Sequence, residues 1–295
     1  MTRPHGLLRA GYPYLKTLGM RRITNFPTDI AFGKDDTAYI LCRSEGITLI
    51  RVWPLQDMEQ QTDDLKQIGG YGSGDGQFIW PVQIITNGDG SLYVSDEATH
   101  RITRFGQDGE FLDKWGVEGA AKGELNGPTG IAFDGDGNMV VVDSRNHRVQ
   151  RFTADGKYLD GFGSHGSEPG QFNLPWGVHV DELGDIYVAD WGNDRVQMFN
   201  AEGHYVWSFR GNASLSRVAR SYMLTNAVSN RLRETGRLEQ EQYLRRPRSV
   251  RVDDEFRLFI ADYESYRIQV YQKDAIPLDD TQFAAPLRNP TLEVT

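Results

Sequence analysis

The chain has 295 residues, 32 Lys+Arg against 41 Asp+Glu, a net charge of −9 and 39% hydrophobic residues. These values fit one large domain or two small ones with a sizeable core, and they exclude a wholly disordered chain. The acidic balance excludes a protein that coats nucleic acid over its whole surface. The single cysteine, Cys42, excludes an intrachain disulfide and a cysteine-built zinc site.

Two features bear on location. No apolar run reaches the roughly 18 residues that a membrane span requires. The first ten residues lack the apolar core of a secretory signal. We therefore expect no membrane partner and a cytoplasmic location.

A repeat with a period of 47 residues dominates the sequence, because Pro81, Pro128 and Pro175 stand 47 positions apart. After each proline, apolar and polar residues alternate in four short runs that are separated by Asp-Gly turns of the hairpin type. More divergent copies begin at Pro27 and Pro247. A four-stranded antiparallel meander cannot bury both of its faces alone, so the units are expected to stack around an axis as a β-propeller.

The best copies of the repeat resemble a known family. Gly-Ile-Ala-Phe-Asp at 130–134 and Val-Asp-Ser-Arg-Asn-His-Arg-Val at 142–149 are similar to the NHL repeat, whose propellers usually have six blades. The resemblance implies an all-β, NHL-type β-propeller that forms a single domain over residues 1–295.

The number of blades depends on the ends of the chain. Five inner strands are expected at 27–32, 81–86, 128–133, 175–180 and 247–252. Residues 282–294 are similar in sequence to an inner strand of the repeat, and residues 11–19 are similar to an outer strand. We therefore expect a sixth blade shared by the N- and C-termini. A five-bladed ring with a loose tail is the alternative.

Some polar residues recur once per blade and are expected to be structural. Each of four aspartates is followed five residues later by an arginine. The pairs are Asp96 and Arg101, Asp143 and Arg148, Asp190 and Arg195, and Asp262 and Arg267. A catalytic group is needed once, whereas these occur in every blade. We therefore expect buried charge pairs that support the turn between the second and third strands.

Binding residues are expected where the repeat varies, beside the inner-strand proline and after the repeated aspartate. Trp80, Trp176, Trp191 and Tyr263 would form an aromatic rim at the channel mouth, with Glu97, Arg246 and Arg248 as its charged members. The alternative for each tryptophan is packing between blades. Arg246 and Arg248 flank Pro247 and are expected to hold an anionic ligand.

The longest departure from the repeat is the segment 212–244, where helical spacing of apolar residues predicts one or two helices. Residues 210–251 contain ten arginines, no lysine and three glutamates. We expect this insertion to be a lid over the mouth or an interface of a homo-oligomer.

Two classes of function remain open. The favoured one is a binding or scaffold module that takes an anionic small molecule or a protein segment, with RNA as a less favoured partner. The alternative is a propeller enzyme, a lyase or hydrolase with its active site in the channel. A zinc lyase needs several converging histidines, but only His179 lies on an inner strand, so no metal cofactor is expected. A calcium-supported site at Asp29, Gln83 and Glu97 is the other option.

Overall fold

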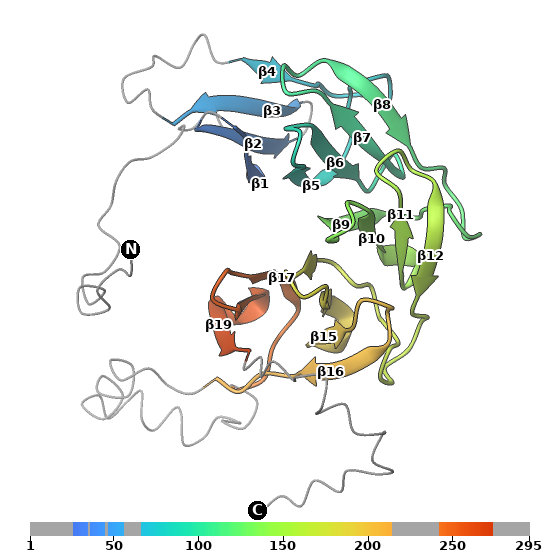
Figure 1. Ribbon diagram of the computed structural model, residues 1–295, viewed down its shortest axis with the longest axis vertical. Helices are drawn as coiled ribbons and strands as arrows, with labels where there is room; N and C mark the ends of the chain where they lie inside the picture. Colours follow the sequence, from blue (N-terminus) through green and yellow to red (C-terminus); the bar gives the residue numbers. More distant parts are fainter. Residues whose placement is uncertain (1–25, 35, 45–46, 56–65, 214–241, 274–295) are drawn as a thin grey trace, which may run out of the picture.

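The computed structural model describes residues 26–34, 36–44, 47–55, 66–213 and 242–273. These residues form five antiparallel sheets that follow one another in chain order around a central axis (Figure 1). Within each sheet, neighbouring strands are also consecutive in the chain. Figure 1 shows β1, β5, β9 and β17 nearest the axis and β4, β8, β12 and β16 at the outside. The predicted all-β propeller with four-stranded blades is confirmed.

The strands of the five sheets have the following bounds. The first sheet contains β1 (Pro27–Phe32), β2 (Thr37–Ser44), β3 (Ile47–Pro54) and β4 (Gln67–Ile68). The second contains β5 (Pro81–Thr86), β6 (Leu92–Asp96), β7 (Arg101–Phe105) and β8 (Phe111–Trp115). The third contains β9 (Pro128–Phe133), β10 (Met139–Asp143), β11 (Arg148–Phe152) and β12 (Tyr158–Phe162). The fourth contains β13 (Val178–Val180), β14 (Ile186–Asp190), β15 (Arg195–Phe199) and β16 (Tyr205–Phe209). The fifth contains β17 (Pro247–Val252), β18 (Arg257–Asp262) and β19 (Arg267–Gln272).

The expectation of six blades is not confirmed, because the described residues form five sheets and the fifth ends at its third strand. The segments 11–19 and 282–294, from which a sixth blade was expected, lie outside the described residues. Residues 214–241 of the expected helical insertion lie outside them too. Helical structure in the described ranges consists of short 3₁₀ turns such as η2 (Ser144–Asn146), η3 (Trp191–Asn193) and η5 (Tyr263–Ser265). None of the helical segments described is long and apolar enough to cross a membrane.

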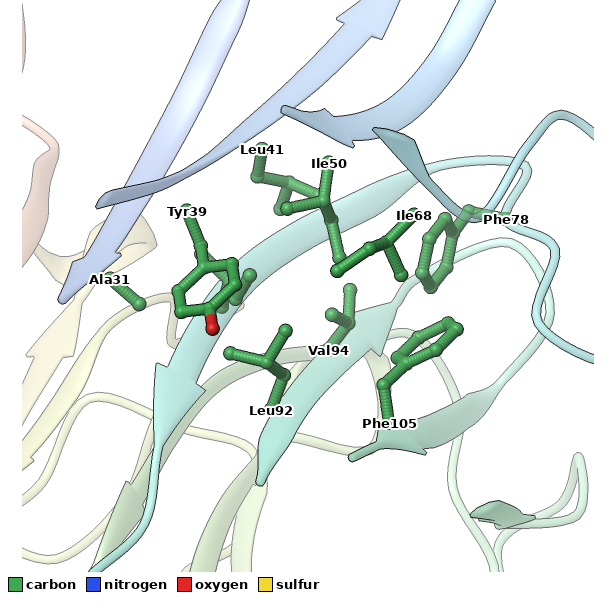
Figure 2. Packing of buried hydrophobic residues seen from close by; sticks show 10 residues of the cluster. Ala31, Tyr39, Leu41, Ile50, Ile68, Phe78, Leu92, Val94 and Phe105 are labelled. Atoms are coloured by element: carbon green, nitrogen blue, oxygen red, sulfur yellow. The ribbon is translucent and has the colours of Figure 1, made fainter. Parts of the chain in front are cut away.

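Apolar side chains between adjacent sheets form the core. Between the first and second sheets, Tyr39 and Leu41 of β2 pack with Leu92 and Val94 of β6 (Figure 2). Similar clusters join the second sheet to the third, the third to the fourth and the fourth to the fifth. Because successive side chains of a strand point to opposite faces, a strand covered on both faces is apolar throughout. The wholly buried strands β6, β10 and β14 follow this rule except at the repeated aspartate that ends each of them and at Ser95 of β6.

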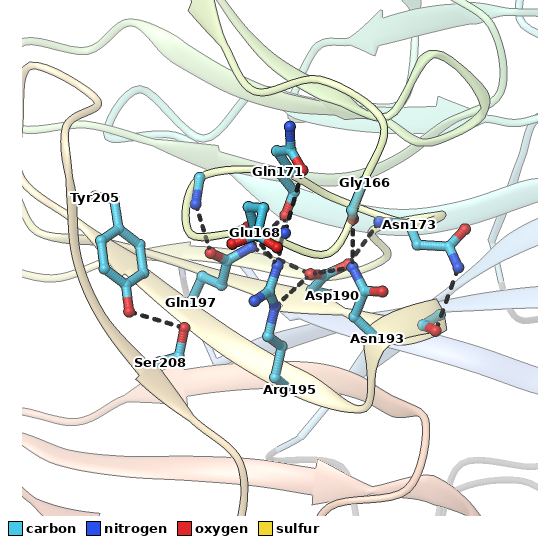
Figure 3. A network of polar contacts seen from close by, with 12 residues as sticks. Gly166, Glu168, Gln171, Asn173, Asp190, Asn193, Arg195, Gln197, Tyr205 and Ser208 are labelled. Carbon is cyan, nitrogen blue, oxygen red and sulfur yellow. Dashed lines mark hydrogen bonds and ion pairs between the residues drawn. The ribbon is translucent and has the colours of Figure 1, made fainter.

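The repeated aspartate is the hub of a buried polar network, shown for the fourth blade in Figure 3. Asp190 Oδ2 accepts hydrogen bonds from Arg195 Nε (2.8 Å), Asn193 Nδ2 (2.9 Å) and Gln197 Nε2 (3.1 Å). Its Oδ1 accepts from the backbone N–H of Asn173 (2.8 Å), which belongs to the connection from the third blade. Burial raises the pKa of Asp190 and these donors oppose that rise, so the network stabilises the charged form.

The arginine of the pair completes the attachment between blades. Arg195 is 1% exposed and donates from Nη2 to the carbonyl oxygens of Glu168 (2.9 Å) and Gln171 (2.8 Å). Gln197 Oε1 accepts from the backbone N–H of Gly170 (2.9 Å). The pair therefore holds the incoming connection as well as its own turn. We call this arrangement the blade latch.

Three of the four predicted pairs form. Arg148 Nε donates to Asp143 (2.7 Å) and Arg267 Nε to Asp262 (2.7 Å), as in the fourth blade. Although both residues are described, Asp96 and Arg101 do not pair. Asp96 instead accepts four backbone N–H groups, and Arg101 donates to the carbonyls of residues 73, 74 and 77. The second blade thus keeps the attachment to its incoming connection without the ion pair.

A second contact joins the blades, through residues with left-handed backbone at the end of the turn after the aspartate. His100, His147 and Asp194 all have φ of 54°. Each accepts a hydrogen bond from the backbone N–H of the residue before the next blade's proline. The bonds are Gly127 to His100 Nδ1 (3.0 Å), Leu174 to His147 Nδ1 (3.0 Å) and Arg246 to Asp194 Oδ1 (2.7 Å).

The blade latch predicts a large loss of stability for Asp190→Ala, because Arg195 would remain buried without its carboxylate. The expected decrease in the free energy of unfolding is about 3–5 kcal/mol. The matched control is Asp160→Ala, which removes the half-exposed partner of Arg151 (2.7 Å) and should cost about 1 kcal/mol or less. Urea unfolding measures both, and equal losses would contradict the role of the latch.

The histidine contact predicts acid sensitivity. Burial lowers the pKa of His147, as does the neighbouring His165, whose ring centroid lies 4.4 Å away. With the folded pKa below the unfolded value, the contribution of His147 is present above about pH 6.5 and is lost as pH falls toward the folded pKa. His147→Asn offers an acceptor that does not titrate, in the place that Asp194 takes in the next blade.

Urea midpoints at pH 7 and pH 5 test this. The midpoint of His147→Asn should fall less between the two pH values than that of the wild type, whereas His147→Ala should be less stable at both. A pH dependence that the asparagine leaves unchanged would show that His147 is not the titrating group.

Candidate functional site

The channel end at which the inner strands begin contains a cavity of about 360 Å³, which we call the mouth cavity. The first residues of β1, β5 and β17 line it, together with Gly130 of β9 and residues 176 and 177 before β13. Arg43, near the end of β2, and Tyr263 of η5, directly after β18, complete this part of the lining. The cavity therefore draws on all five described sheets.

Close contact between inner strands positions one wall of the mouth cavity. The Gly130 N–H donates to the carbonyl oxygen of Trp176 (2.8 Å). A Cβ atom at Gly177 would lie 2.6 Å from the carbonyl oxygen of Arg248. Only glycine permits this approach, so Trp176 and Arg248 are brought side by side.

Arg248 is held by two aromatic rings. Its guanidinium carbon lies 4.5 Å from the ring centroid of Trp176 and 4.9 Å from that of Tyr263. Stacking of this kind uses the face of the guanidinium and leaves its N–H edge free to bind an acceptor. Arg248 is therefore positioned by contacts that do not neutralise its charge.

Arg43 is placed in a similar way by Trp80, whose ring centroid is 4.2 Å from the guanidinium carbon. Its Nη1 donates to the Pro81 carbonyl oxygen (3.2 Å). Burial lowers the pKa of Arg43, and the positive charge of Arg248 lowers it further. Arginine stays protonated despite such shifts, so two cations that repel each other line the cavity, and Arg251 is a third arginine of its lining.

Neither cation is neutralised within the described part of the chain. No carboxylate there lies within 4.0 Å of Arg43 or Arg248, although Glu97 and Asp96 act on Arg43 at longer range. The described acidic residue that lines the cavity is Asp29, whose Oδ2 accepts from the Ile84 N–H (3.0 Å). The mouth cavity thus has an excess of positive charge in a protein of net charge −9.

Four of the residues expected to bind ligand line the mouth cavity: Gln83, Trp176, Arg248 and Tyr263. Gln83 is buried between strands, where its Oε1 accepts from the Ile131 N–H (2.8 Å). Trp80 lies behind Arg43 and is not part of the lining.

The remaining rim residues contact each other or neighbouring side chains instead. Arg246 has φ of 51°, pairs with Glu264 (3.1 Å) and lies over the ring of Trp191 (4.3 Å). Glu97 pairs with Arg145 (2.7 Å). Arg246, Trp191 and Glu97 are absent from the lining of the mouth cavity. Arg246 and Arg248 therefore do not act on the same cavity.

The donors considered for calcium do not converge. Asp29 and Gln83 accept backbone N–H groups of the neighbouring blade, and Glu97 pairs with Arg145. Within the described ranges there is no group of three or more His, Cys, Asp or Glu side chains that could hold a metal ion.

His179 lies at the other end of the channel, in a cavity of about 290 Å³ that we call the far cavity. The second halves of the inner strands line it. His179 Nε2 is 3.1 Å from the Val252 carbonyl oxygen. Since a carbonyl only accepts, Nε2 carries the proton and Nδ1 is left as an acceptor. Burial, with the nearby Arg251 charge, lowers the pKa of His179 to about 4, so the ring is neutral at pH 7.

Sequence reasoning missed Arg43 and Arg251. Cys42 pairs with Pro27 as Asp96 pairs with Pro81, so Arg43 stands where Glu97 stands in the second blade. Arg251 lies four residues after Pro247, as His179 lies four after Pro175. Alignment of the divergent repeats by these positions would have identified both arginines.

The family model described as the NHL repeat matches residues 125–152 and 172–199. These ranges contain β9 to β11 and β13 to β15 together with their latch residues. No curated protein matches the chain.

Several solved structures share the fold. A gluconolactonase from Xanthomonas campestris is 16% identical with a TM-score of 0.50, covering 78% of this chain and 67% of its own. A catalytically inactive variant of virginiamycin B lyase from Staphylococcus aureus is 11% identical with a TM-score of 0.53, covering 86% and 87%. A protein of unknown function from Bacteroides thetaiotaomicron is 19% identical with a TM-score of 0.58, covering 82% and 58%. At these identities the likeness concerns the fold alone.

The surroundings of His179 predict its titration. We expect an NMR titration of the ring to give a pKa of about 4, and Arg251→Met to raise that pKa because one of the causes that lower it is removed. A pKa near the ordinary 6.5 in the folded wild type would contradict the buried, neutral ring.

Proposed function

We propose, on the premise that this chain is an NHL-repeat β-propeller, that it is a binding module whose mouth cavity takes an anionic ligand. The observation that carries the proposal is the pair of arginines, Arg43 and Arg248, which line one cavity and have no carboxylate partner among the residues described. A ligand with two or more negative charges would relieve their mutual repulsion. Such a ligand is an anionic small molecule or an acidic protein segment.

The stacked geometry favours recognition at the edge of each guanidinium. The aromatic contacts of Arg248 with Trp176 and Tyr263, and of Arg43 with Trp80, restrict the two side chains before the ligand arrives. Restricting long side chains in advance lowers the entropy cost of binding. Carboxylate and phosphate groups both match the planar array of N–H donors.

An enzymatic role is the alternative. Its support is the fold shared with structures named gluconolactonase and virginiamycin B lyase, and fold similarity does not carry activity. The side chains of the mouth cavity that would act as metal ligands or bases, Asp29 and Gln83, each accept a backbone N–H of the neighbouring blade through one oxygen. The free polar edges belong to arginines, which suits binding of an anion.

Isothermal titration of the purified chain with succinate and with inorganic phosphate tests this proposal. Hydrogen bonds to a charged group contribute about 1.5–3 kcal/mol each. The double variant Arg43→Gln/Arg248→Gln should therefore bind the better of the two probes at least about tenfold more weakly. Its thermal midpoint should change little, because neither guanidinium forms an ion pair with a described carboxylate.

The matched control is Arg246→Gln, which alters a rim arginine that pairs with Glu264 outside the mouth cavity. It should leave the affinity for the probe unchanged. If Arg246→Gln weakens binding and the double variant does not, the anion site lies at the rim and the proposal is wrong.

A further inference from the structure

The far cavity takes no part in the anion binding proposed for the mouth cavity, and its lining is mainly apolar. Ten of its fourteen lining residues are Ile, Val, Phe or Ala. Ile30 and Phe32 of β1, the first described strand, are 43% and 62% exposed, whereas Ile84 of β5 and Ile131 of β9 are buried against the preceding blade. Apolar surface of this kind inside a cavity is typical of a ligand site.

The polar side chains of the far cavity are few and mostly satisfied. Thr86 Oγ1 donates to the Phe32 carbonyl oxygen (2.9 Å), and Gln83 accepts the Ile131 N–H (2.8 Å). His179 donates through Nε2 to the Val252 carbonyl oxygen. The polar groups of the cavity left for a ligand are therefore Arg251, the Nδ1 acceptor of His179 and the Nε2 amide of Gln83.

Arg251 is the charged group that lines the far cavity, and it lies at its inner end, since it also lines the mouth cavity. Its Nη1 donates to the carbonyl oxygens of Val250 (2.9 Å) and Val178 (3.4 Å). No carboxylate of the described residues lies within 4.0 Å of it, although its charge acts at longer range on Asp29, where it lowers the pKa. The guanidinium is thus charged, without an ion pair to a described residue, beside an apolar wall.

We propose that the far cavity is a second binding site, for a small apolar carboxylate. The carboxylate would accept hydrogen bonds from Arg251, and the hydrocarbon part would cover Ile30 and Phe32. A purely inorganic anion would leave those apolar side chains in water, and an uncharged hydrocarbon would bury a cation without a partner. The apolar lining together with the positive charge of Arg251 therefore favours an anion that carries a hydrocarbon group.

The test uses octanoate as the probe, with acetate and 1-octanol as matched probes that lack the hydrocarbon and the charge. Titration of the full chain followed by calorimetry or ligand-observed NMR should show octanoate binding at least tenfold tighter than either. Arg251→Met should weaken octanoate at least tenfold and bring its affinity to that of octanol. Phe32→Asp, at an exposed position, should weaken octanoate by a similar factor without affecting the fold.

Two variants separate this site from the mouth. Arg248→Gln lies outside the far cavity and should leave octanoate affinity within twofold of the wild type. If Arg248→Gln weakens octanoate and Phe32→Asp does not, the probe binds at the mouth, and the far-cavity proposal fails while the mouth proposal stands. Octanoate that binds no better than acetate, or as well to Phe32→Asp as to the wild type, also overturns it. Phe32→Asp remains decisive if Arg251→Met does not fold.

Discussion

Each later blade of this propeller is attached to the chain that enters it by a buried aspartate, and the remaining architecture depends on that attachment. The carboxylate of Asp190 joins its own turn to Asn173, and its partner Arg195 holds two carbonyls of the same connection. Burying two charges is costly unless hydrogen bonds replace the lost water. In the fourth blade both carboxylate oxygens of Asp190 and the Nε and Nη2 groups of Arg195 have such partners, which explains why these residues repeat while the loops around them vary. The same aspartates also hold the backbone one or two residues before Pro81, Pro128, Pro175 and Pro247.

Because the latch fixes the blades, the positions next to it are free to differ and to bind. Arg43 follows Cys42, which stands at the position of the repeated aspartate in the first blade. Arg248 follows Pro247, the proline of the inner strand in the fifth blade. Aromatic rings from adjacent positions support both guanidinium groups. At the opposite channel end the same strands carry apolar side chains and one cation, Arg251. The two ends of the channel thus offer different chemistry on one scaffold.

The fold class, the strand order within a blade and three of four charge pairs could be predicted from the sequence, because the same pattern occurs in several repeats. The prediction of a sixth blade relied on two isolated matches to the repeat, at 11–19 and 282–294. A single match to one strand does not show which strand it pairs with. Arg246 and Arg248 looked equivalent because both flank a proline. The left-handed backbone of Arg246 directs it to Glu264. Arg43 was not predicted because Cys42 stands where the other blades have the repeated aspartate, so the equivalence of Arg43 to Glu97 was not recognised.

The central claim is that Arg43 and Arg248 form an unneutralised cationic site at the channel mouth. The most direct measurement is a crystal structure determined with selenate, whose anomalous scattering locates the anion without reference to the protein. The account predicts a selenium peak in the mouth cavity with selenate oxygens within about 3 Å of N–H groups on both guanidinium groups. A structure in which the two arginines pair with carboxylates of this chain, and selenate binds elsewhere, would contradict it.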